Sequence, residues 1–363
     1  MNFTRLGTVG VIALSGALLL SSCAANEPAS PSASASVSDL SGTIDGAGAS
    51  SQGSAQDAWI ASFQTANPDV TVNYDPSGSG AGRTAFIAGG VDFAGTDSSL
   101  KPEEIAGGFA GCVAGSGYIQ VPAYISPIAI IFNVAGVDKL NLDAATLAGI
   151  FKGTITTWND PAIVALNKDA KLPSAAITAV HRSDDSGTTK NFADYLNQNA
   201  PEVWDQAPAD TFPFQAGEAA KGTSGVVDAV TNGTNTIGYA DASKAGKLGV
   251  AAIKVGDKFV TYSAEAAAAV VNDSPAGATA SATDLSIKLD RKTTDPTHYP
   301  LVLVSYIITC TEFTDAKVAP TVKAYVEYVT SEAGQKEAAA SAGAAPLSAE
   351  LSAKVATALE AIK

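Results

Sequence analysis

The sequence predicts an α/β fold, and three features support that prediction. Helix-forming stretches alternate with Val- and Ile-rich runs along most of the chain, as in folds where strands are followed by helices. Hydrophobic residues make up 46% and charged residues 16%, so a sizeable core is available. The length of 363 residues is enough for two domains of ordinary size.

The N-terminus predicts export. Arg5 precedes an apolar run over 9–20 that is too short to span a bilayer comfortably, and the run ends in LSSC. This ending looks like a bacterial lipobox, with 1–22 as signal peptide and Cys23 as the lipidated residue anchored at the outer face of the cell membrane. The alternative is an ordinary signal peptide with a chance cysteine. The Ala-, Ser- and Pro-rich stretch 23–40 is expected to be a flexible tether.

The charge of the chain limits its partners. The formal net charge is −14, which argues against nucleic-acid binding, because affinity for phosphate backbones comes from clustered Lys and Arg. A single small anion is still compatible with this charge, because local dipoles and one Arg can dominate inside a cleft.

Three strand–loop–helix or strand–loop units follow the tether. They occupy 42–65, 70–89 and 91–100, and their loops are rich in Gly, Ser and Thr. Loops at the carboxyl ends of strands in an open α/β sheet converge on one crevice, so these loops predict a shared site. The first loop is not a dinucleotide fingerprint, because Ser51 stands where the third glycine should be.

A fourth loop has the strongest chemical signal. The stretch HRSDDSGTTKNF, 181–192, brings Arg182, hydroxyls and a glycine to the start of a predicted helix. Unpaired N–H groups and the helix dipole favour an anion there, and the guanidinium suits oxyanions. Asp184 and Asp185 would repel that anion, so at least one of them is expected to hold Arg182.

The remaining chain continues the α/β pattern. We expect a long strand within 117–134, two helices within 143–167, a short strand at 236–239 followed by a helix to 245, and a helix followed by a loop over 264–283. The apolar run 299–310 is expected to be a buried strand that returns to the first domain, and helices are expected at 318–329 and 348–362.

Two cysteines remain after the proposed lipidation site. Cys112 and Cys310 form a natural disulfide pair in a chain exported to an oxidising space. The alternative is a pair of buried free thiols.

Together, several stretches resemble one family, the phosphate-binding lipoproteins of bacterial phosphate-specific ABC transporters. The motifs are GAGAS (46–50), NYDPSGSGAG (73–82), VDFAGTD (91–97), LAGIFKGTITTWNDPAI (147–163), HRSDDSGTTKNFADYL (181–196), IGYAD (237–241) and GAAPL (343–347). The resemblance implies a two-lobed periplasmic-binding-protein fold of type 2 that closes on phosphate and delivers it to a membrane permease. Lobe one would combine 41–123 with 302–363, lobe two would hold 124–301, and 121–128 and 298–305 would be the hinge strands.

The resemblance also implies a ligand set. Asp184 would pair with Arg182, and neither a cofactor, a metal nor a second copy of the chain is expected. In one departure, the family usually has an aromatic residue and then a proline where this chain has Ser51-Gln52, so the Ser51 backbone donor is less firmly positioned. The implied phosphate ligands are Ser50, Ser51, Ser79, Asp97, Arg182, Ser186, Gly187 and Thr188.

Three other functions are compatible with parts of the sequence. The first is binding of another tetrahedral oxyanion such as sulfate or arsenate. The second is a secreted hydrolase with Ser186 as nucleophile and His181 as base, although the chain has two histidines and no G-x-S-x-G motif. The third is an adhesive lipoprotein without a small ligand.

Overall fold

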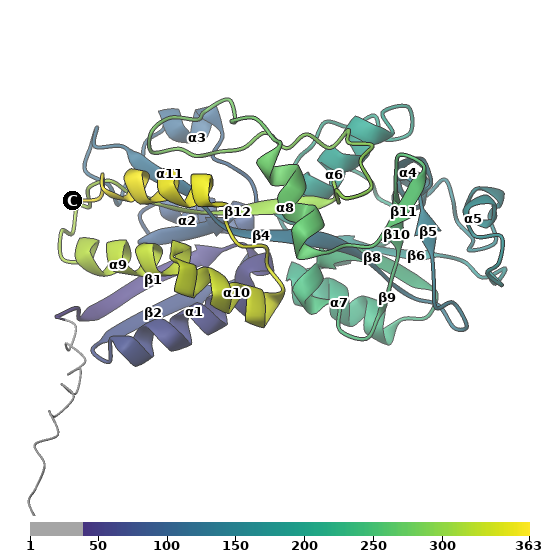
Figure 1. The fold of residues 1–363 in the computed structure, drawn as a ribbon, viewed down its shortest axis with the longest axis horizontal. Coiled ribbons are helices and arrows are strands. Elements are labelled where there is room, and N and C mark those ends of the chain that lie inside the picture. The colour runs from purple at the N-terminus through teal and green to yellow at the C-terminus, as the bar shows by residue number, and fades with distance from the viewer. Residues whose placement is uncertain (1–38) are drawn as a thin grey trace, which may run out of the picture. The chain divides into compact units, whose positions relative to one another are not determined.

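A mixed nine-stranded sheet runs through the part of the chain that the structure, a computed structural model, describes (Figure 1). That part is residues 39–363; the predicted signal peptide, Cys23 and nearly all of the tether lie outside the described residues. The strand order is β2-β1-β3-β12-β4-β8-β6-β7, with β9 paired to β4. The strands are β1 Gly42–Gly48, β2 Val70–Asp75, β3 Phe93–Thr96, β4 Tyr118–Asn133, β6 Thr178–Arg182, β7 Glu218–Ala220, β8 Thr236–Asp241, β9 Gly249–Val250 and β12 Val302–Cys310.

Helices flank this sheet, so the predicted α/β class is confirmed (Figure 1). A small second sheet has the order β11-β10-β5, with β5 Asn141–Leu142, β10 Ala252–Val255 and β11 Lys258–Val260. The α-helices are α1 Gly53–Ala66, α2 Ser79–Ile87, α3 Pro102–Ala106, α4 Ala144–Lys152, α5 Pro161–Leu166, α6 Gly187–Asn199, α7 Gly222–Asn232, α8 Ala264–Asn272, α9 Ala319–Thr330, α10 Glu332–Ala342 and α11 Ala349–Leu359.

The long strand β4 joins the two ends of the sheet. Its first part pairs antiparallel with β12, from Tyr118↔Cys310 to Pro127↔Val302, and its last part pairs with β8. Fourteen of its sixteen residues are buried, which explains the nearly continuous apolar sequence. The predicted strands within 117–134 and 299–310 are both confirmed.

A bulge interrupts the pairing of β4 with β12. Ser305 faces Tyr124 and Tyr306 faces Pro122, so Ala123 is an extra residue without a partner on β12. Its carbonyl accepts a hydrogen bond of 2.8 Å from Gln335 Nε2 on α10. The bulge therefore lies next to Pro122, which has no N–H to contribute to the ladder. The carbonyl of Ala123, which has no partner on β12, accepts a hydrogen bond from helix α10 instead.

Local capping explains several helix ends. Asp143 accepts from Thr146 N at the start of α4, and Gly153 ends that helix at φ 80°, a left-handed conformation that glycine adopts without strain. Pro161 is the first residue of α5, where its missing N–H costs nothing. Both helices expected within 143–167 are therefore confirmed.

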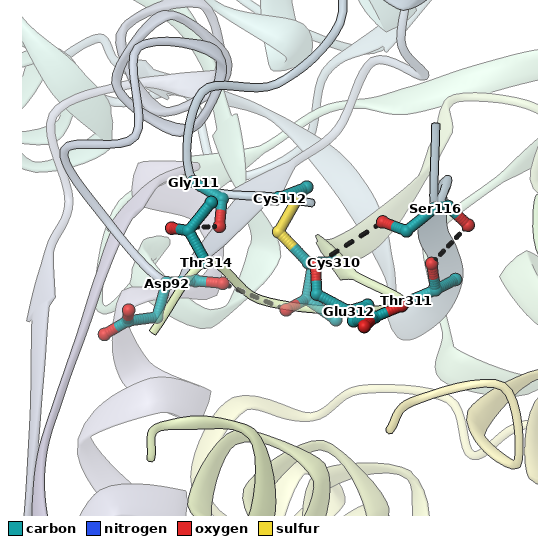
Figure 2. The surroundings of a disulfide bond; sticks show 9 residues. Asp92, Gly111, Cys112, Ser116, Cys310, Thr311, Glu312 and Thr314 are labelled. Atoms are coloured by element: carbon teal, nitrogen blue, oxygen red, sulfur yellow. Dashed lines mark hydrogen bonds between the residues drawn. A yellow bond between two sulfur atoms is a disulfide. The ribbon is translucent and has the colours of Figure 1, made fainter. Parts of the chain in front are cut away.

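Cys112 and Cys310 form a disulfide that links residues 198 positions apart (Figure 2). Hydrogen bonds flank the disulfide. Val113 N donates to Glu312 O at 2.9 Å. Thr314 Oγ1 donates to Gly111 O at 3.0 Å, as Figure 2 shows. The predicted disulfide is confirmed. It fastens the loop before β4 to the end of β12.

Some expectations about secondary structure are wrong. The strand at 236–239 continues to Asp241, and only a 3₁₀ turn, Ala242–Lys244, replaces the helix expected after it. Asp241 caps that turn by accepting from Ser243 N. The helices α7 and α10 were not anticipated. The Ala- and Ser-rich sequence of α10 has little apolar periodicity, whereas α7 does carry a helical signal, because Val226 and Val230 lie four residues apart and are both buried.

Candidate functional site

The start of helix α6 lies at the centre of the site. Ser186 is the N-cap, and its Oγ accepts from Thr189 N at 3.2 Å. Its own N–H donates to the carbonyl of Asp210 at 2.9 Å. Gly187 and Thr188, which follow, are buried, and first-turn N–H groups have no partner within their helix. The positive end of the α6 dipole therefore lies among buried residues.

The start of helix α2 meets the start of α6. Gly78 precedes α2 at φ 108°, and Ser79 is the first helical residue. Ser79 Oγ accepts from Asp97 N at 3.1 Å. A Cβ on Gly187 would lie 2.7 Å from both Ser79 Oγ and Asp97 Cβ. Only glycine fits at this contact, because real Cβ atoms do not approach so closely.

Asp97 is the carboxylate around which the hydroxyls gather. Its Oδ1 accepts from Ser51 Oγ at 2.7 Å and from Ser305 Oγ at 2.6 Å, and its Oδ2 accepts from Thr188 Oγ1 at 2.9 Å. Burial raises the pKa of the Asp97 carboxyl, and the three hydroxyl donors and the charge of Arg182 offset part of that increase.

Arg182, at the end of β6, is held by Asp184. Its Nε donates to Asp184 Oδ1 at 2.7 Å and its Nη2 donates to Asp184 Oδ2. Asp184 also accepts from Gly222 N, at the start of α7. Burial acts to raise the pKa of Asp184, but the bonds from Arg182 and Gly222 outweigh it and the pKa is lowered. The carboxylate therefore stays ionised and fixes the guanidinium.

The first loop reaches the same region from β1. Ser50 Oγ lies 3.0 Å from Thr223 Oγ1 and accepts from Thr223 N at 3.1 Å, so it contacts the start of α7. Ser51 contacts Asp97, as described above. A Cβ on Gly78 would lie 2.4 Å from Asp184 Oδ2, which shows that the Arg182 ion pair packs against the α2 loop. The structure thus gathers all the residues named as ligands into one cluster.

Similarity to known proteins supports a single family. The family model described as "PBP superfamily domain" matches residues 33–333. The chain is 36% identical to phosphate-binding protein PstS 3 of Mycobacterium tuberculosis, with all of both chains covered, and 33% identical to phosphate-binding protein PstS 2 of the same organism, again with all of both chains covered. The chain belongs to the PstS family of phosphate-binding proteins.

Solved structures show which fold this chain shares. A phosphate-binding protein from Stenotrophomonas maltophilia superimposes with a TM-score of 0.68 at 21% identity, over 87% of this chain and 93% of that one. A high-affinity periplasmic phosphate-binding protein solved with bound phosphate gives a TM-score of 0.68 at 23% identity, over 86% and 93%. These likenesses confirm the periplasmic-binding-protein fold class.

Several residues of the site were not expected from the sequence. Ser305 lies in the otherwise apolar first half of β12. A single hydroxyl among apolar residues was the only feature of the sequence that could have pointed to it. Asp210 forms a buried ion pair of 2.7 Å with Arg83 of α2 and accepts from Ser98 Oγ at 2.5 Å. Asn191 Nδ2 donates to the Asp97 carbonyl at 2.8 Å.

The geometry does not favour the hydrolase alternative. The His181 ring stacks on Phe212 with centroids 3.9 Å apart, and its Nδ1 contacts the Arg182 carbonyl. Burial lowers the pKa of His181. Ser186 Oγ is engaged as the α6 cap, and no hydrogen bond within 39–363 joins Ser186 to His181. The pair therefore lacks the nucleophile–base contact that such a mechanism needs.

Proposed function

We propose that this protein captures inorganic phosphate outside the membrane and delivers it to the permease of an ABC transporter. The observation that carries the proposal is the convergence of two helix starts and several hydroxyls on the buried carboxylate of Asp97, together with the guanidinium of Arg182, which Asp184 holds against the α2 loop. The residues proposed to contact phosphate are Ser50, Ser51, Ser79, Asp97, Arg182, Ser186, Gly187 and Thr188.

The donor chemistry suits a dehydrated oxyanion. An unpaired buried charge is very costly, so every phosphate oxygen needs donors. Hydroxyls, first-turn N–H groups and one Arg supply them, and Asp184 balances the guanidinium. Charge-assisted hydrogen bonds contribute about 1.5–3 kcal/mol each. Several such bonds are enough for tight capture without a strongly basic cleft.

A thermal-shift screen tests this function against its alternatives. Phosphate is expected to raise the melting temperature in a concentration-dependent way, because it binds only the folded state. Arsenate, sulfate and molybdate serve as competing oxyanions, and release of phosphate from a generic ester tests for hydrolysis. Stabilisation by sulfate without stabilisation by phosphate would contradict the proposal, as would stabilisation by none of the anions.

We also propose that the chain forms two lobes that close on the ligand, with 41–123 plus 302–363 as lobe one and 124–301 as lobe two. Contacts between these segments fit a closed state: Gly80 N donates to Asp185 O at 3.0 Å, and Arg83 pairs with Asp210. Phosphate would favour the closed state, because its ligands come from both lobes. Small-angle scattering of the phosphate-free protein is expected to show compaction when phosphate is added, and an unchanged radius of gyration would contradict the two-lobe proposal.

The proposed anchor is a lipid on Cys23 at the outer face of the cell membrane. Within 39–363 none of the helices has the length and apolarity required to span a bilayer. Cys23→Ala is expected to yield unlipidated protein that is shed or misprocessed, as measured by intact mass and membrane fractionation. A variant that matches wild type in both measurements would rule out the lipobox. We expect the anchored protein to act as a monomer without a cofactor.

A further inference from the structure

A chain of buried hydrogen bonds leads from helix α9 to the Asp97 carboxylate. Ser305 donates to Asp97 Oδ1 at 2.6 Å, and Gln52 Nε2 donates to Ser305 Oγ at 2.7 Å. Gln56 Nε2 donates to Gln52 Oε1 at 2.8 Å, and the Tyr325 hydroxyl donates to Gln56 Oε1 at 2.6 Å. The four side chains behind Asp97 are each at most 1% exposed, so water cannot substitute for any link.

A backbone carbonyl fixes which group donates and which accepts in each of these hydrogen bonds. Gln52 Nε2 also donates to Tyr306 O at 3.1 Å, and a carbonyl can only accept, so the amide must present its NH₂ group on this side. Ser305 Oγ therefore accepts from Gln52, and its own hydrogen is left to point at Asp97. On its other side Gln52 presents a carbonyl oxygen, which requires the NH₂ group of Gln56.

We propose that Ser305 is a positioning residue for phosphate recognition: its hydroxyl, oriented by Gln52, keeps Asp97 as an acceptor for the proton of the ligand. The inference rests on the proposed function. Ser305 and Ser51 together occupy Oδ1. Oδ2, which contacts Thr188 at the start of α6, is thus the oxygen turned toward the proposed anion position.

The hydroxyls act on the ionisation of Asp97 as well as on its orientation. Each donated hydrogen bond stabilises the ionised form against the effect of burial. Without Ser305 the carboxyl would take up a proton at higher pH, and a protonated Asp97 cannot accept the proton of phosphate. The other charged or titratable groups around Asp97 and its loop stay the same: Arg182 on β6, Tyr74 on β2, Arg83 on α2, Lys190 and Asp194 on α6, Asp210, and Arg291.

The test is the pH dependence of phosphate affinity in Ser305→Ala. Calorimetry on wild type and variant from about pH 5 to about pH 8 gives the ratio of their Kd values. Free phosphate ionises identically in both titrations, so this ratio reports only groups of the protein. The ratio is expected to grow as the pH falls, reaching about tenfold to a hundredfold, the factor that one charge-assisted hydrogen bond contributes.

Matched variants separate positioning from packing. Thr309→Val removes a hydroxyl from an equally buried residue of β12 itself, where the hydroxyl donates to the backbone carbonyl of Asp92 at 2.9 Å. The ratio of the Kd of this variant to the Kd of wild type is expected to be independent of pH. Ser305→Thr keeps a hydroxyl and is expected to recover most of the wild-type profile. Gln52→Leu leaves Ser305 in place but removes its orienting donor, so it should shift the profile in the same direction by a smaller factor.

The outcomes distinguish this inference from the proposed function. Wild-type binding of phosphate together with a pH-independent ratio for both Ser305→Ala and Gln52→Leu would overturn the positioning role alone. If Ser305→Ala does not fold, Gln52→Leu decides the same question. A wild type that binds no phosphate at any pH would overturn the proposed function and this inference with it.

Discussion

Asp97→Asn is expected to remove most of the preference for phosphate over sulfate while phosphate still binds. Near neutral pH phosphate carries at least one proton and sulfate carries none. Ionised Asp97 can accept that proton in a short, charge-assisted bond. Facing sulfate, the same carboxylate would meet only acceptor oxygens and a like charge. Sites built around such a hydrogen bond reject ligands that lack it by roughly 10⁴–10⁵-fold.

The hydrogen bonds at Asp97 predict how the introduced amide will lie in the variant. Oδ1 accepts from two hydroxyls, Ser51 and Ser305, so the carbonyl oxygen of the amide is expected at that position. The NH₂ group then takes the place of Oδ2, beside Thr188, where it can donate to a bound anion. Sulfate gains a donor and loses a repulsive charge, whereas phosphate loses one acceptor, a loss of about tenfold to a hundredfold.

Calorimetry with both anions on wild type and Asp97→Asn measures this effect. Burial raises the pKa of Asp97, so wild-type discrimination is present above that pKa and is lost as the pH falls through it. The variant has no such titration, so the ratio of wild-type to variant selectivity should fall as the pH falls through this pKa, because the ionisation of free phosphate affects both proteins equally. A wild type that binds sulfate as well as phosphate, or a variant with unchanged selectivity, would remove Asp97 from this role.

Loss of the disulfide is expected to have the largest effect on stability. The bond between Cys112 and Cys310 closes a loop of 198 residues. In the chain-entropy model a loop of this length stabilises the folded state by about 5 kcal/mol, and measured values are often smaller. Replacing both cysteines with serine should therefore lower the melting temperature by up to about 10 °C.

Phosphate binding should survive this double variant. The flanking bonds from Val113 and Thr314 remain, and they hold the same two segments together in the folded state. Differential scanning calorimetry gives the stability, and phosphate titration at a temperature well below the transition gives the affinity. Equal melting temperatures for wild type and double variant would contradict the expected stabilisation. So would two titratable thiols in the denatured, unreduced wild type.

The sequence predicted the elements whose signals are local. Strand–loop–helix units such as β2 to α2 combine alternating apolar residues, a Gly- and Ser-rich turn and a helical run, and all three signals lie within a few residues of one another. The start of α6 was predicted for the same reason, because the N-cap, the glycine and the Arg are adjacent in the chain.

The residues that support Asp97 could not be predicted in this way. Ser305 reaches Asp97 because β12 lies antiparallel to β3 with Tyr306 opposite Thr96, a pairing across more than two hundred positions. Gln52 was interpreted only as a departure from the family pattern. Its role depends on a carbonyl of β12 that no local pattern reveals. Long-range register, rather than residue type, decided these contacts.

The bulge at Ala123 means that β4 has two frames of alternation. Before it, the odd-numbered Ile119 and Val121 lie opposite the odd-numbered residues of β12, Thr309 and Ile307; after it, the even-numbered Tyr124 and Ser126 do, opposite Ser305 and Leu303. Ala123 is thus the residue of β4 that can be deleted without moving any neighbour to the opposite face. If one residue were deleted elsewhere in the strand and no new bulge formed, every side chain beyond the deletion would move to the opposite face of the sheet. Length changes in this family should therefore collect in the loops and spare β4, except at this position.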